Sequence, residues 1–348
     1  MRNSIVEDDL NFIINSDNPW DSLEGTNILI SGAGGFLPAY MVKTILYLNE
    51  TRFNDKAKIF ALVRNKENAL KRFSNYYIGD ELNFIVQDVC KPININEKIH
   101  YIIHAASQAS PKFCKKDPVG TLCPNTLGTY YLLEIAKEKN VKSFLFFSSA
   151  EIYGKVEENE IPTKEKHFGC VDPTDVRSSY AESKRMGETM CISWFKQYKV
   201  PVKIIRPFHT YGPGMNLNDG RVFADFVSNI VKKEDLVIKS DGKSIRAFCY
   251  LADAVTGFFS VLLKGKNGES YNVGNDKCEI SITELAEKLV NLFPEYKLSV
   301  IKERRDDSEY LESKVIRNCP DISKICSIGW EPHYSIEEGF KRTIESFK

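Results

Sequence analysis

The sequence predicts an α/β protein with a doubly wound parallel sheet and a smaller C-terminal α/β subdomain. Short apolar runs of strand length alternate with helical patterns from residue 27 to about 206, which indicates a parallel sheet covered by helices on both faces. A glycine-rich turn joins the first strand to the first helix of that alternation. After about Gly212 the pattern loosens, and loops rich in Gly, Asn and Asp separate the remaining helices.

The first part of the chain supplies the elements of the sheet in order. Residues 1–24 form a polar arm, whose apolar positions Leu10, Phe12, Ile13 and Ile14 fit a short helix docked on the body. The strands are short apolar runs, and we expect them at 27–30, 58–63, 83–86, 101–106, 142–148 and 202–206. The intervening helices are expected at 39–48, 126–140 and 180–198.

The later part of the chain predicts three more helices, at 221–232, 253–264 and 281–293. The region after residue 235 also contains apolar runs that can return as strands to the main sheet. We therefore expect three units: an arm at 1–24, a main domain at 25–212, and a second unit at 213–348 that is interleaved with the first.

Composition and charge exclude several classes of protein. The 348 residues contain 47 Lys and Arg against 47 Asp and Glu, so no basic excess favours nucleic acid or an anionic membrane. The longest apolar runs, such as Phe144–Phe147, are too short to span a bilayer. The nine cysteines form no Cys-x-x-Cys pair and no metal-binding spacing, and the N-terminus is acidic where a signal peptide is apolar. We expect a cytoplasmic protein with reduced thiols and no metal.

The glycine-rich turn, Gly32-Ala-Gly-Gly35, follows a strand and opens a helix. Glycines permit a tight turn and a close approach to a pyrophosphate, which then lies at the helix N-terminus. The turn therefore predicts a Rossmann-type domain that binds NAD or NADP through Gly32, Gly35, Phe36 and Leu37. The third glycine of the usual spacing is replaced by Pro38, which suits the first turn of a helix but changes how that helix packs on its strand.

The end of the second strand leaves the choice of cofactor open. An acidic residue usually stands there and hydrogen-bonds the adenosine ribose, whereas this chain has Arg64. Arg64 can meet the 2′-phosphate of NADP, helped by Lys66, or it can belong to a solvated basic loop. Asp88 and Val89, after the third strand, are expected beside the adenine.

A candidate catalytic set follows in Ser149, Tyr180 and Lys184. A tyrosine four residues before a lysine on a helix places both side chains on one face, where the ammonium favours the phenolate. A serine alongside completes a relay that can accept a proton from a sugar alcohol while hydride leaves the adjacent carbon. Glu151, two residues after Ser149, is a candidate general base.

Together these motifs resemble the extended short-chain dehydrogenase/reductase family of nucleotide-sugar enzymes, from about Asn27 to the C-terminus. The resemblance is closest to the UDP-glucuronate decarboxylases. Besides the segments above, it is carried by His104–Pro111, Asn125–Thr129, Gly187–Cys191, Arg206–Pro213, Asn218–Val222, Arg246–Tyr250 and Gly329–Pro332.

The resemblance implies roles for further residues. Tyr180 is the base, Lys184 its electrostatic partner and Ser149 the catalytic hydroxyl, while Glu151 lies beside C5 of the sugar. The additional cofactor-binding positions are Ala105, Ala106, Ser107, Asn125 and Pro207, with Tyr180 and Lys184 also contacting the cofactor. The substrate side, in the second unit and the loops facing it, comprises Ser110, Arg177, His209, Arg221, Val222, Arg246 and Arg317, although His209 also fits a structural role. Arg221 and Arg246 correspond to arginines that reach the nucleotide diphosphate.

One departure from the family pattern leaves the exact reaction open. Ala150 stands where decarboxylases carry serine and dehydratases carry aspartate, and Ser-Ala at this place resembles the 4-epimerases. The best hypothesis is an enzyme like UDP-glucuronate decarboxylase that works on a UDP-sugar through a 4-keto intermediate. The alternatives are a 4- or 5-epimerase, an atypical 4,6-dehydratase, a reductase with exchangeable NADPH, or a cofactor-binding protein without turnover. The family also implies a homodimer that pairs helices near 121–140 and 180–199.

Overall fold

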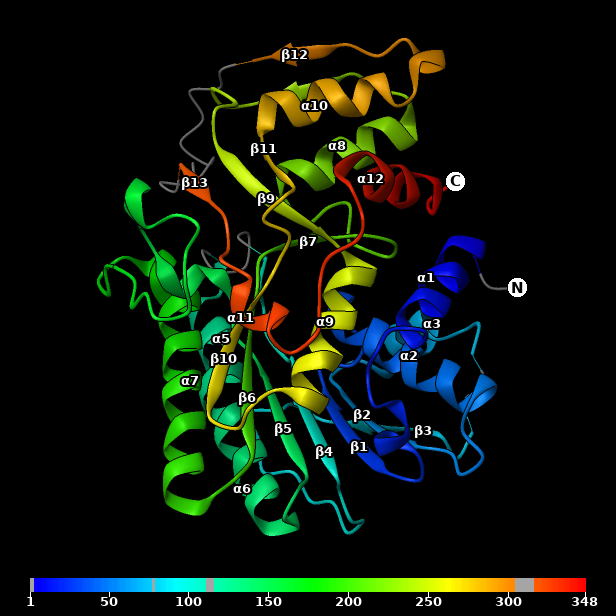
Figure 1. Ribbon diagram of the computed structural model, residues 1–348, viewed down its shortest axis with the longest axis vertical. Helices are drawn as coiled ribbons and strands as arrows, with labels where there is room; N and C mark the ends of the chain where they lie inside the picture. The colour runs from blue at the N-terminus through cyan, green and yellow to red at the C-terminus, as the bar shows by residue number, and fades with distance from the viewer. Residues whose placement is uncertain (1–2, 77–78, 111–115, 304–315) are drawn as a thin grey trace.

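Seven parallel strands form the central sheet of the computed structural model, which describes residues 3–76, 79–110, 116–303 and 316–348 (Figure 1). In spatial order they are β3 (Leu82–Val86), β2 (Lys58–Val63), β1 (Asn27–Ser31), β4 (Tyr101–His104), β5 (Ser143–Phe147), β6 (Val202–Pro207) and β10 (Glu269–Val273). The direction of winding reverses between β1 and β4. A doubly wound sheet leaves a crevice at that point, at the carboxyl ends of its strands.

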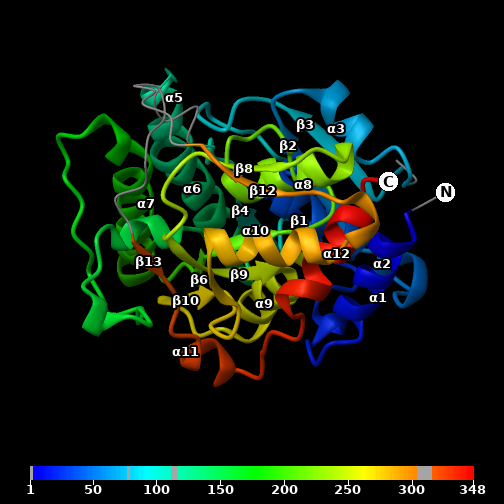
Figure 2. The ribbon, with the colours of Figure 1, turned by 90° about the horizontal axis from the view of Figure 1, so that it is seen from above.

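Helices cover both faces of this sheet. On one face lie α6 (Thr129–Lys139) and α7 (Ser179–Tyr198), next to α5 (Pro118–Cys123); on the other lie α1 (Ser4–Ile14), α2 (Phe36–Thr51) and α9 (Leu251–Lys264) (Figure 2). The sequence of strand β5 is almost entirely apolar because helices bury both of its faces. Phe144 and Phe146 pack toward α6 and α7, whereas Leu145 and Phe147 face the opposite side, where the Phe147 ring lies 4.9 Å from that of Phe258.

A second lobe stands over the carboxyl ends of the central strands (Figure 1). Its strand β9 (Ile245–Tyr250) pairs with β7 (His209–Tyr211), β11 (Glu279–Ser281) and β13 (Arg317–Asn318), while β8 (Leu236–Ile238) pairs with β12 (Val300–Lys302). Its helices are α8 (Val222–Lys232), α10 (Ile282–Asn291) and α12 (Ile336–Glu345), with α11 (Ser323–Cys326) beside β10.

The predicted fold class is confirmed, and most predicted elements lie within three residues of their expected ends. Strand β4 ends at His104 rather than at Ala106, and the helix expected at 126–140 is α6 preceded by a π-helical turn at Pro124–Gly128. Strand β10 comes from the later part of the chain and pairs with β6. The division into units at residues 24 and 212 stays a prediction. The sequence analysis missed α3 (Lys66–Arg72) and the short strands of the second lobe.

The N-terminal arm is fastened to three other elements by one carboxylate. Asp9, on α1, is fully buried and accepts hydrogen bonds from the hydroxyls of Tyr40 on α2, at 3.0 Å, and Tyr250 at the end of β9, at 2.8 Å. Its other oxygen accepts from Nη2 of Arg342 on α12 at 2.7 Å. Burial raises the pKa of Asp9, and the charge of Arg342 opposes that shift. The arm thus joins the sheet-bearing lobe to the last helix of the chain.

Candidate active site

A cavity of about 960 Å³ lies between the carboxyl ends of the central strands and the second lobe. This is where doubly wound folds bind their ligands. It is lined on the sheet side by the glycine turn and by the segments that follow β2, β3, β4, β5 and β6. The second lobe contributes residues from β7, β9, β13 and the start of α8.

The glycine turn has the geometry that close approach to a ligand requires. Gly32 has a φ of +68°, and a side chain there would bring its Cβ to 2.7 Å from Cα of Ala106. Gly35 caps α2, and its N–H donates to the carbonyl of Gly32 at 2.8 Å. Pro38 is the third residue of α2, where no hydrogen bond from its nitrogen is needed. The turn therefore keeps its shape without a third glycine.

A buried histidine, which the sequence analysis passed over, fixes the backbone beside this turn. Nε2 of His104 lies 3.2 Å from the carbonyl oxygen of Pro124, which can only accept, so Nε2 carries the proton. Nδ1 then accepts from the Ser31 hydroxyl at 2.7 Å, and that hydroxyl oxygen accepts the N–H groups of Ala105 and Ala106 at 3.1 Å each. Burial, with a smaller contribution from the charge of Lys184, lowers the pKa of His104 to about 3. The ring is therefore a neutral, fixed link between β1 and β4.

Arg64, Asp88 and Val89, which follow β2 and β3, line the end of the cavity beyond the glycine turn. The N–H of Cys90 donates to Asp88 at 2.9 Å and is the main cause that lowers the pKa of Asp88; the charge of Arg64 adds to it. Asn65 and Asn68 line the same end, and the sequence analysis did not include them. This end thus combines a cation with side-chain amides and one carboxylate.

The four candidate catalytic residues all line the cavity. Ser149 follows β5 and caps a 3₁₀ turn over Ala150–Tyr153, where its hydroxyl accepts the N–H of Glu151 at 3.1 Å. Glu151 is exposed to the cavity. Tyr180 and Lys184 lie one turn apart on α7, and Nζ of Lys184 is 5.8 Å from the centre of the Tyr180 ring.

Lys184 is held in a buried and unusual environment. Its Nζ donates to the carbonyl of Phe147 at 2.6 Å and lies 5.2 Å from the Phe146 ring. Burial lowers the pKa of Lys184 to about 7, although the charge of Glu188 opposes the shift. Because its pKa lies close to neutral pH, Lys184 is readily protonated when a negative charge forms at Tyr180.

Three buried oxygens on the cavity wall indicate that a polar ligand fits there. Within the part of the chain that the structure describes, the hydroxyls of Ser107 and Ser148 and Oδ1 of Asn318 are buried without a hydrogen-bond partner, and all three residues line the cavity. Buried polar atoms in native proteins nearly always have a partner. The residues of this cavity therefore fit a ligand that carries several hydrogen-bonding groups, such as a dinucleotide.

Asn125 is placed one layer behind the cavity rather than on its wall. It is fully buried, and its Nδ2 donates to the Thr121 carbonyl at 3.1 Å and to the Ser183 hydroxyl at 2.9 Å. It lies within the π-helical turn, a type of local irregularity that is frequent at functional sites. This geometry lets Asn125 fix α5 and α7 relative to each other.

On the substrate side, Arg177, Arg221 and Arg246 line the cavity, as do His209 and Val222; Pro207, predicted on the cofactor side, lines it as well. Arg246 is buried in β9, and its Nη1 donates to the carbonyl of Ile245 at 2.8 Å. Burial lowers the pKa of His209, and the charges of Arg246 and Arg221 add to the shift. Beside this neutral imidazole stand two guanidinium groups, of which that of Arg221 lies 3.5 Å from the carboxylate of Asp219. The two guanidinium groups suit a diphosphate.

Two predicted substrate residues lie away from the cavity wall. The hydroxyl of Ser110 donates to the carbonyl of Asp219 at 2.8 Å, so it holds the loop before Arg221. Arg317 forms a fork with Glu279, at 2.5 and 2.9 Å, and a further bond with Glu158 at 2.6 Å. Its neighbour Asn318 lines the cavity instead.

The described residues include no group of three or more His, Cys, Asp or Glu side chains placed to hold a metal ion. Nor does the described part of the chain contain a helix with the length and apolar character needed to cross a membrane.

Comparison with known proteins identifies the family. Residues 28–274 match the family described as the NAD dependent epimerase/dehydratase family. The chain is 33% identical to UDP-glucuronic acid decarboxylase 3 of Arabidopsis thaliana, over 92% of this chain and 89% of that protein. It is 34% identical to UDP-glucuronic acid decarboxylase 1 of Xenopus tropicalis, over 92% of this chain and 72% of that protein.

Solved structures give the same fold. UDP-glucose 4-epimerase of Thermotoga maritima is 23% identical and covers 92% of this chain and 98% of its own, with a TM-score of 0.77. UDP-glucuronic acid 4-epimerase of Bacillus cereus is 20% identical and covers 92% of this chain and 99% of its own, also with a TM-score of 0.77. The resemblance drawn from the motifs is therefore confirmed: this chain belongs to the NAD-dependent epimerase/dehydratase family, as an enzyme of the extended short-chain dehydrogenase/reductase type.

Proposed function

We propose that this protein is a UDP-glucuronate decarboxylase that works through a 4-keto intermediate with tightly bound NAD. The observation that carries this proposal is the meeting of Ser149, Glu151, Tyr180 and Lys184 on one wall of the cavity. The named relatives that share about a third of their residues with nearly the whole chain support the choice of reaction.

The side chains have distinct tasks in this reaction. Tyr180, in its phenolate form, accepts the proton of the C4 hydroxyl, and Ser149 donates a hydrogen bond to the same oxygen. The positive charge of Lys184 stabilises the phenolate, and its ammonium donates a hydrogen bond to the Phe147 carbonyl. NAD, when bound, supplies the acceptor and later the donor of the C4 hydride. In the 4-keto sugar the C6 carboxylate belongs to a β-keto acid, so carbon dioxide leaves and the electron pair passes to the C4 carbonyl.

Glu151 acts in the second half of the reaction. After carbon dioxide has left, C5 must receive a proton, and Glu151 is the carboxyl group of the catalytic turn that faces the cavity. We assign Glu151 the proton transfer at C5. Ala150, beside it, has no hydroxyl that could assist this transfer.

The cofactor lies along the sheet side in this proposal. The residues that hold it are Gly32, Gly35, Phe36, Leu37, Asp88, Val89, Ala105, Ala106, Ser107 and Pro207, all of which line the cavity. The family favours NAD, and Arg64 then faces solvent or the adenosine ribose. Denaturing the purified protein and identifying the released nucleotide tests this choice. NADP alone would assign Arg64 to the 2′-phosphate.

The nucleotide diphosphate lies along the second lobe. Arg221 and Arg246 hold its phosphates, Arg177 faces the sugar, and His209 and Val222 complete the wall. Uridine is the base that the named relatives favour.

A 4-epimerase acting on a UDP-uronic acid is the second candidate, because Ala150 lacks the hydroxyl that decarboxylases carry. Mass spectrometry of the protein incubated with UDP-glucuronate separates the two. Loss of carbon dioxide supports the decarboxylase. An unchanged mass with altered chromatographic retention supports the epimerase, and loss of water supports a dehydratase.

We further propose a cytoplasmic homodimer that pairs α6 and α7 with their counterparts. Several large apolar side chains at this face are exposed: Leu127 by 47%, Met186 by 52% and Tyr198 by 42%. Exposed apolar clusters of this kind mark protein interfaces. Light scattering of Met186→Glu against the unmodified protein tests the pairing, and an unchanged mass would contradict it.

A further inference from the structure

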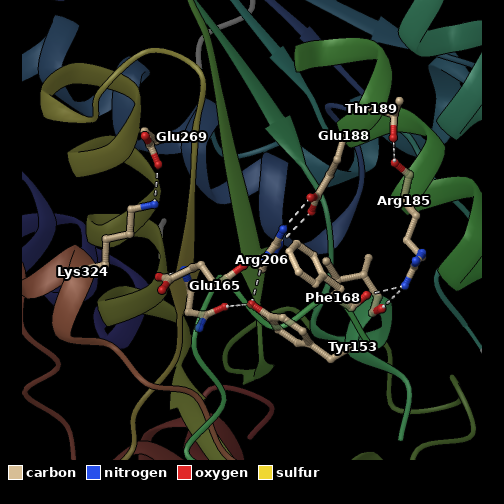
Figure 3. A network of polar contacts seen from close by, with 11 residues as sticks. Tyr153, Glu165, Phe168, Arg185, Glu188, Thr189, Arg206, Glu269 and Lys324 are labelled. Carbon is tan, nitrogen blue, oxygen red and sulfur yellow. Dashed lines mark hydrogen bonds and ion pairs between the residues drawn. The ribbon is translucent and has the colours of Figure 1, made fainter. Parts of the chain in front are cut away.

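A buried network of polar side chains lies behind the turn that carries Glu151 (Figure 3). Its centre is Arg206 of β6, which is 7% exposed. Nε and Nη2 of Arg206 donate to the two carboxylate oxygens of Glu188, at 2.8 and 2.6 Å. Nη1 donates to the Tyr153 hydroxyl at 2.9 Å and to the backbone carbonyl of Glu165 at 2.8 Å.

Tyr153 links this network to the catalytic turn. It is the last residue of the turn, two positions after Glu151, and it is 1% exposed. While its hydroxyl oxygen accepts from Arg206, its O–H donates to Oδ1 of Asn272 on β10 at 2.6 Å. Burial raises the pKa of Tyr153 to about 12, so the hydroxyl keeps its proton and both bonds. The end of the turn is therefore fixed to two strands of the central sheet.

A second arginine fixes the turn to α7. Arg185 directly follows Lys184, and its Nη1 donates to the carbonyls of Ile152, at 3.3 Å, and Phe168, at 2.6 Å (Figure 3). The helix that carries Tyr180 and Lys184 thus holds the residue next to Glu151.

The carboxylate of Glu151 has no such support of its own. Among the described residues no hydrogen bond to this carboxylate is found; only the backbone of Glu151 is bound, its N–H to the hydroxyl of Ser149 at 3.1 Å and its carbonyl to the N–H of Gly154 at 3.1 Å. Ser149 depends on the turn less, because it directly follows Ser148, whose N–H donates to the carbonyl of Ile205 in β6 at 2.8 Å. The position of Glu151 relative to Tyr180 is therefore set by how the turn is seated.

The energetics of the network point the same way. An ion pair as buried as that of Arg206 and Glu188 can often be replaced by apolar side chains without loss of stability, so stability alone does not account for it. What such a network does give is one defined geometry. The turn held here carries a group whose chemistry depends on being in place to within a fraction of an ångström.

We propose that Tyr153, held by Arg206 and Asn272, is a positioning residue for Glu151 and so controls the step that follows C4 oxidation. This inference rests on the proposed function. Loosening the turn leaves the relay of Ser149, Tyr180 and Lys184 intact and slows the transfer of a proton at C5.

Tyr153→Phe is the variant that tests this. It removes one hydroxyl and leaves Glu188, whose charge acts on Lys184, in place. Arg185→Gln, which removes the tie to Ile152, is a second and independent test. The matched control is Lys324→Met, whose ion pair with Glu269, at 2.7 Å, lies in the same region but joins α11 to β10 (Figure 3).

Three quantities are measured on the whole protein with UDP-glucuronate: the first-turnover appearance of reduced cofactor at 340 nm, the steady-state rate of carbon dioxide release, which falls when the later proton transfer at C5 delays turnover, and the unfolding temperature. We expect Tyr153→Phe and Arg185→Gln to slow steady-state carbon dioxide release by about tenfold to a hundredfold, because each cycle then waits for the proton transfer at C5, and small misplacements have effects of this size. Reduced cofactor is expected to form at a nearly normal rate and then accumulate. Lys324→Met is expected to change neither rate.

A double-mutant cycle with Glu151→Gln distinguishes positioning from a general structural effect. If Tyr153 acts through Glu151, Tyr153→Phe has no further effect on carbon dioxide release once Glu151 is glutamine. Additive losses, or equal losses of oxidation and of carbon dioxide release, would overturn the inference. Normal carbon dioxide release by the wild type and by both single variants would overturn this inference and leave the proposed function standing. No release by the wild type would contradict the proposed function itself.

Discussion

The two walls of the cavity are built on different principles. The sheet-side wall is made mainly of segments that directly follow a central strand, such as Gly32–Gly35 after β1 and Ser148–Glu151 after β5, together with Tyr180 and Lys184 of α7. The second-lobe wall is assembled from single residues of separate short elements, among them His209, Arg221 and Arg246. The first wall works largely through backbone shape and the second through charged side chains. Changes to the first should therefore abolish steps, whereas changes to the second should weaken binding.

The largest effect is expected from Tyr180→Phe, on the sheet-side wall. It removes the proton acceptor of the oxidation step, and turnover should fall by about 10²–10⁴-fold. Calorimetry should show UDP binding nearly unchanged, because the uridine and its phosphates lie against the other wall. Tyr296→Phe, in the second lobe and outside the cavity lining, is the control. Wild-type turnover in Tyr180→Phe would refute the mechanism.

Gly32→Ala tests whether backbone shape makes the first wall. The alanine Cβ would approach Cα of Ala106 to 2.7 Å at a φ of +68°. The left-handed conformation alone costs about 1–2 kcal/mol of stability. Because relief of the strain and of the clash moves the turn out of its binding geometry, we expect roughly a tenfold loss of cofactor affinity. Gly34→Ala is the matched control, since its nearest neighbours lie 3.9 Å away. The amount of nucleotide that copurifies measures both, and equal amounts would contradict this account.

Arg221→Ala and Arg246→Ala test the second wall. Each should lose charge-assisted bonds worth about 1.5–3 kcal/mol, or roughly a tenfold to hundredfold loss of UDP affinity. The rate of turnover of bound substrate should change much less. Arg52→Ala, which breaks a surface ion pair with Asp21, is the control in calorimetry. Unchanged UDP affinity in both cavity variants would remove the diphosphate from this wall.

The smallest effect concerns pH and the fixed histidine behind the first wall. His104 stays neutral in the folded protein down to about pH 3, whereas the unfolded chain takes up a proton near 6.5. The unfolded state therefore binds more protons between these values, and stability contributed by His104 is present above pH 6.5 and lost as the pH falls toward 3. His104→Asn should remove this contribution, so that the free energy of unfolding falls less steeply as the pH is lowered, by up to about 1.4 kcal/mol per pH unit. Urea unfolding at pH 8, 6 and 5 measures it, and parallel pH profiles would contradict the assignment.

The contrast between the walls also explains what the sequence could predict. The glycine turn, Asp88 and the Tyr180–Lys184 pair are encoded by neighbours in sequence on regular elements, so their placement followed from strand and helix patterns. The arginines of the second lobe were found only by resemblance, because Arg221 precedes α8 and Arg246 lies in β9, and neither position has a local pattern that marks it as a ligand residue.

Two residues show where reasoning from the sequence reaches its limit. The resemblance placed Arg317 at the substrate, yet Glu279 and Glu158, which come from distant parts of the chain, hold its guanidinium. His104 lies in an apolar strand and was passed over, because its partners Ser31 and Pro124 are brought to it only by the pairing of β1 with β4 and by the π-helical turn. In both cases long-range partners decide the role of the side chain.

The carboxylate of Asp9 has a consequence for how the chain folds. It joins residue 9 to residue 342, a contact that spans nearly the whole chain. Contacts of such long sequence separation carry a high entropic cost of closure and form late. On the ribosome, α1 can dock on α2 early, through Tyr40 and Tyr47, but its bond to Arg342 must wait until synthesis is almost complete. In pulsed hydrogen exchange during refolding, the amides of α12 should gain protection after those of the central sheet.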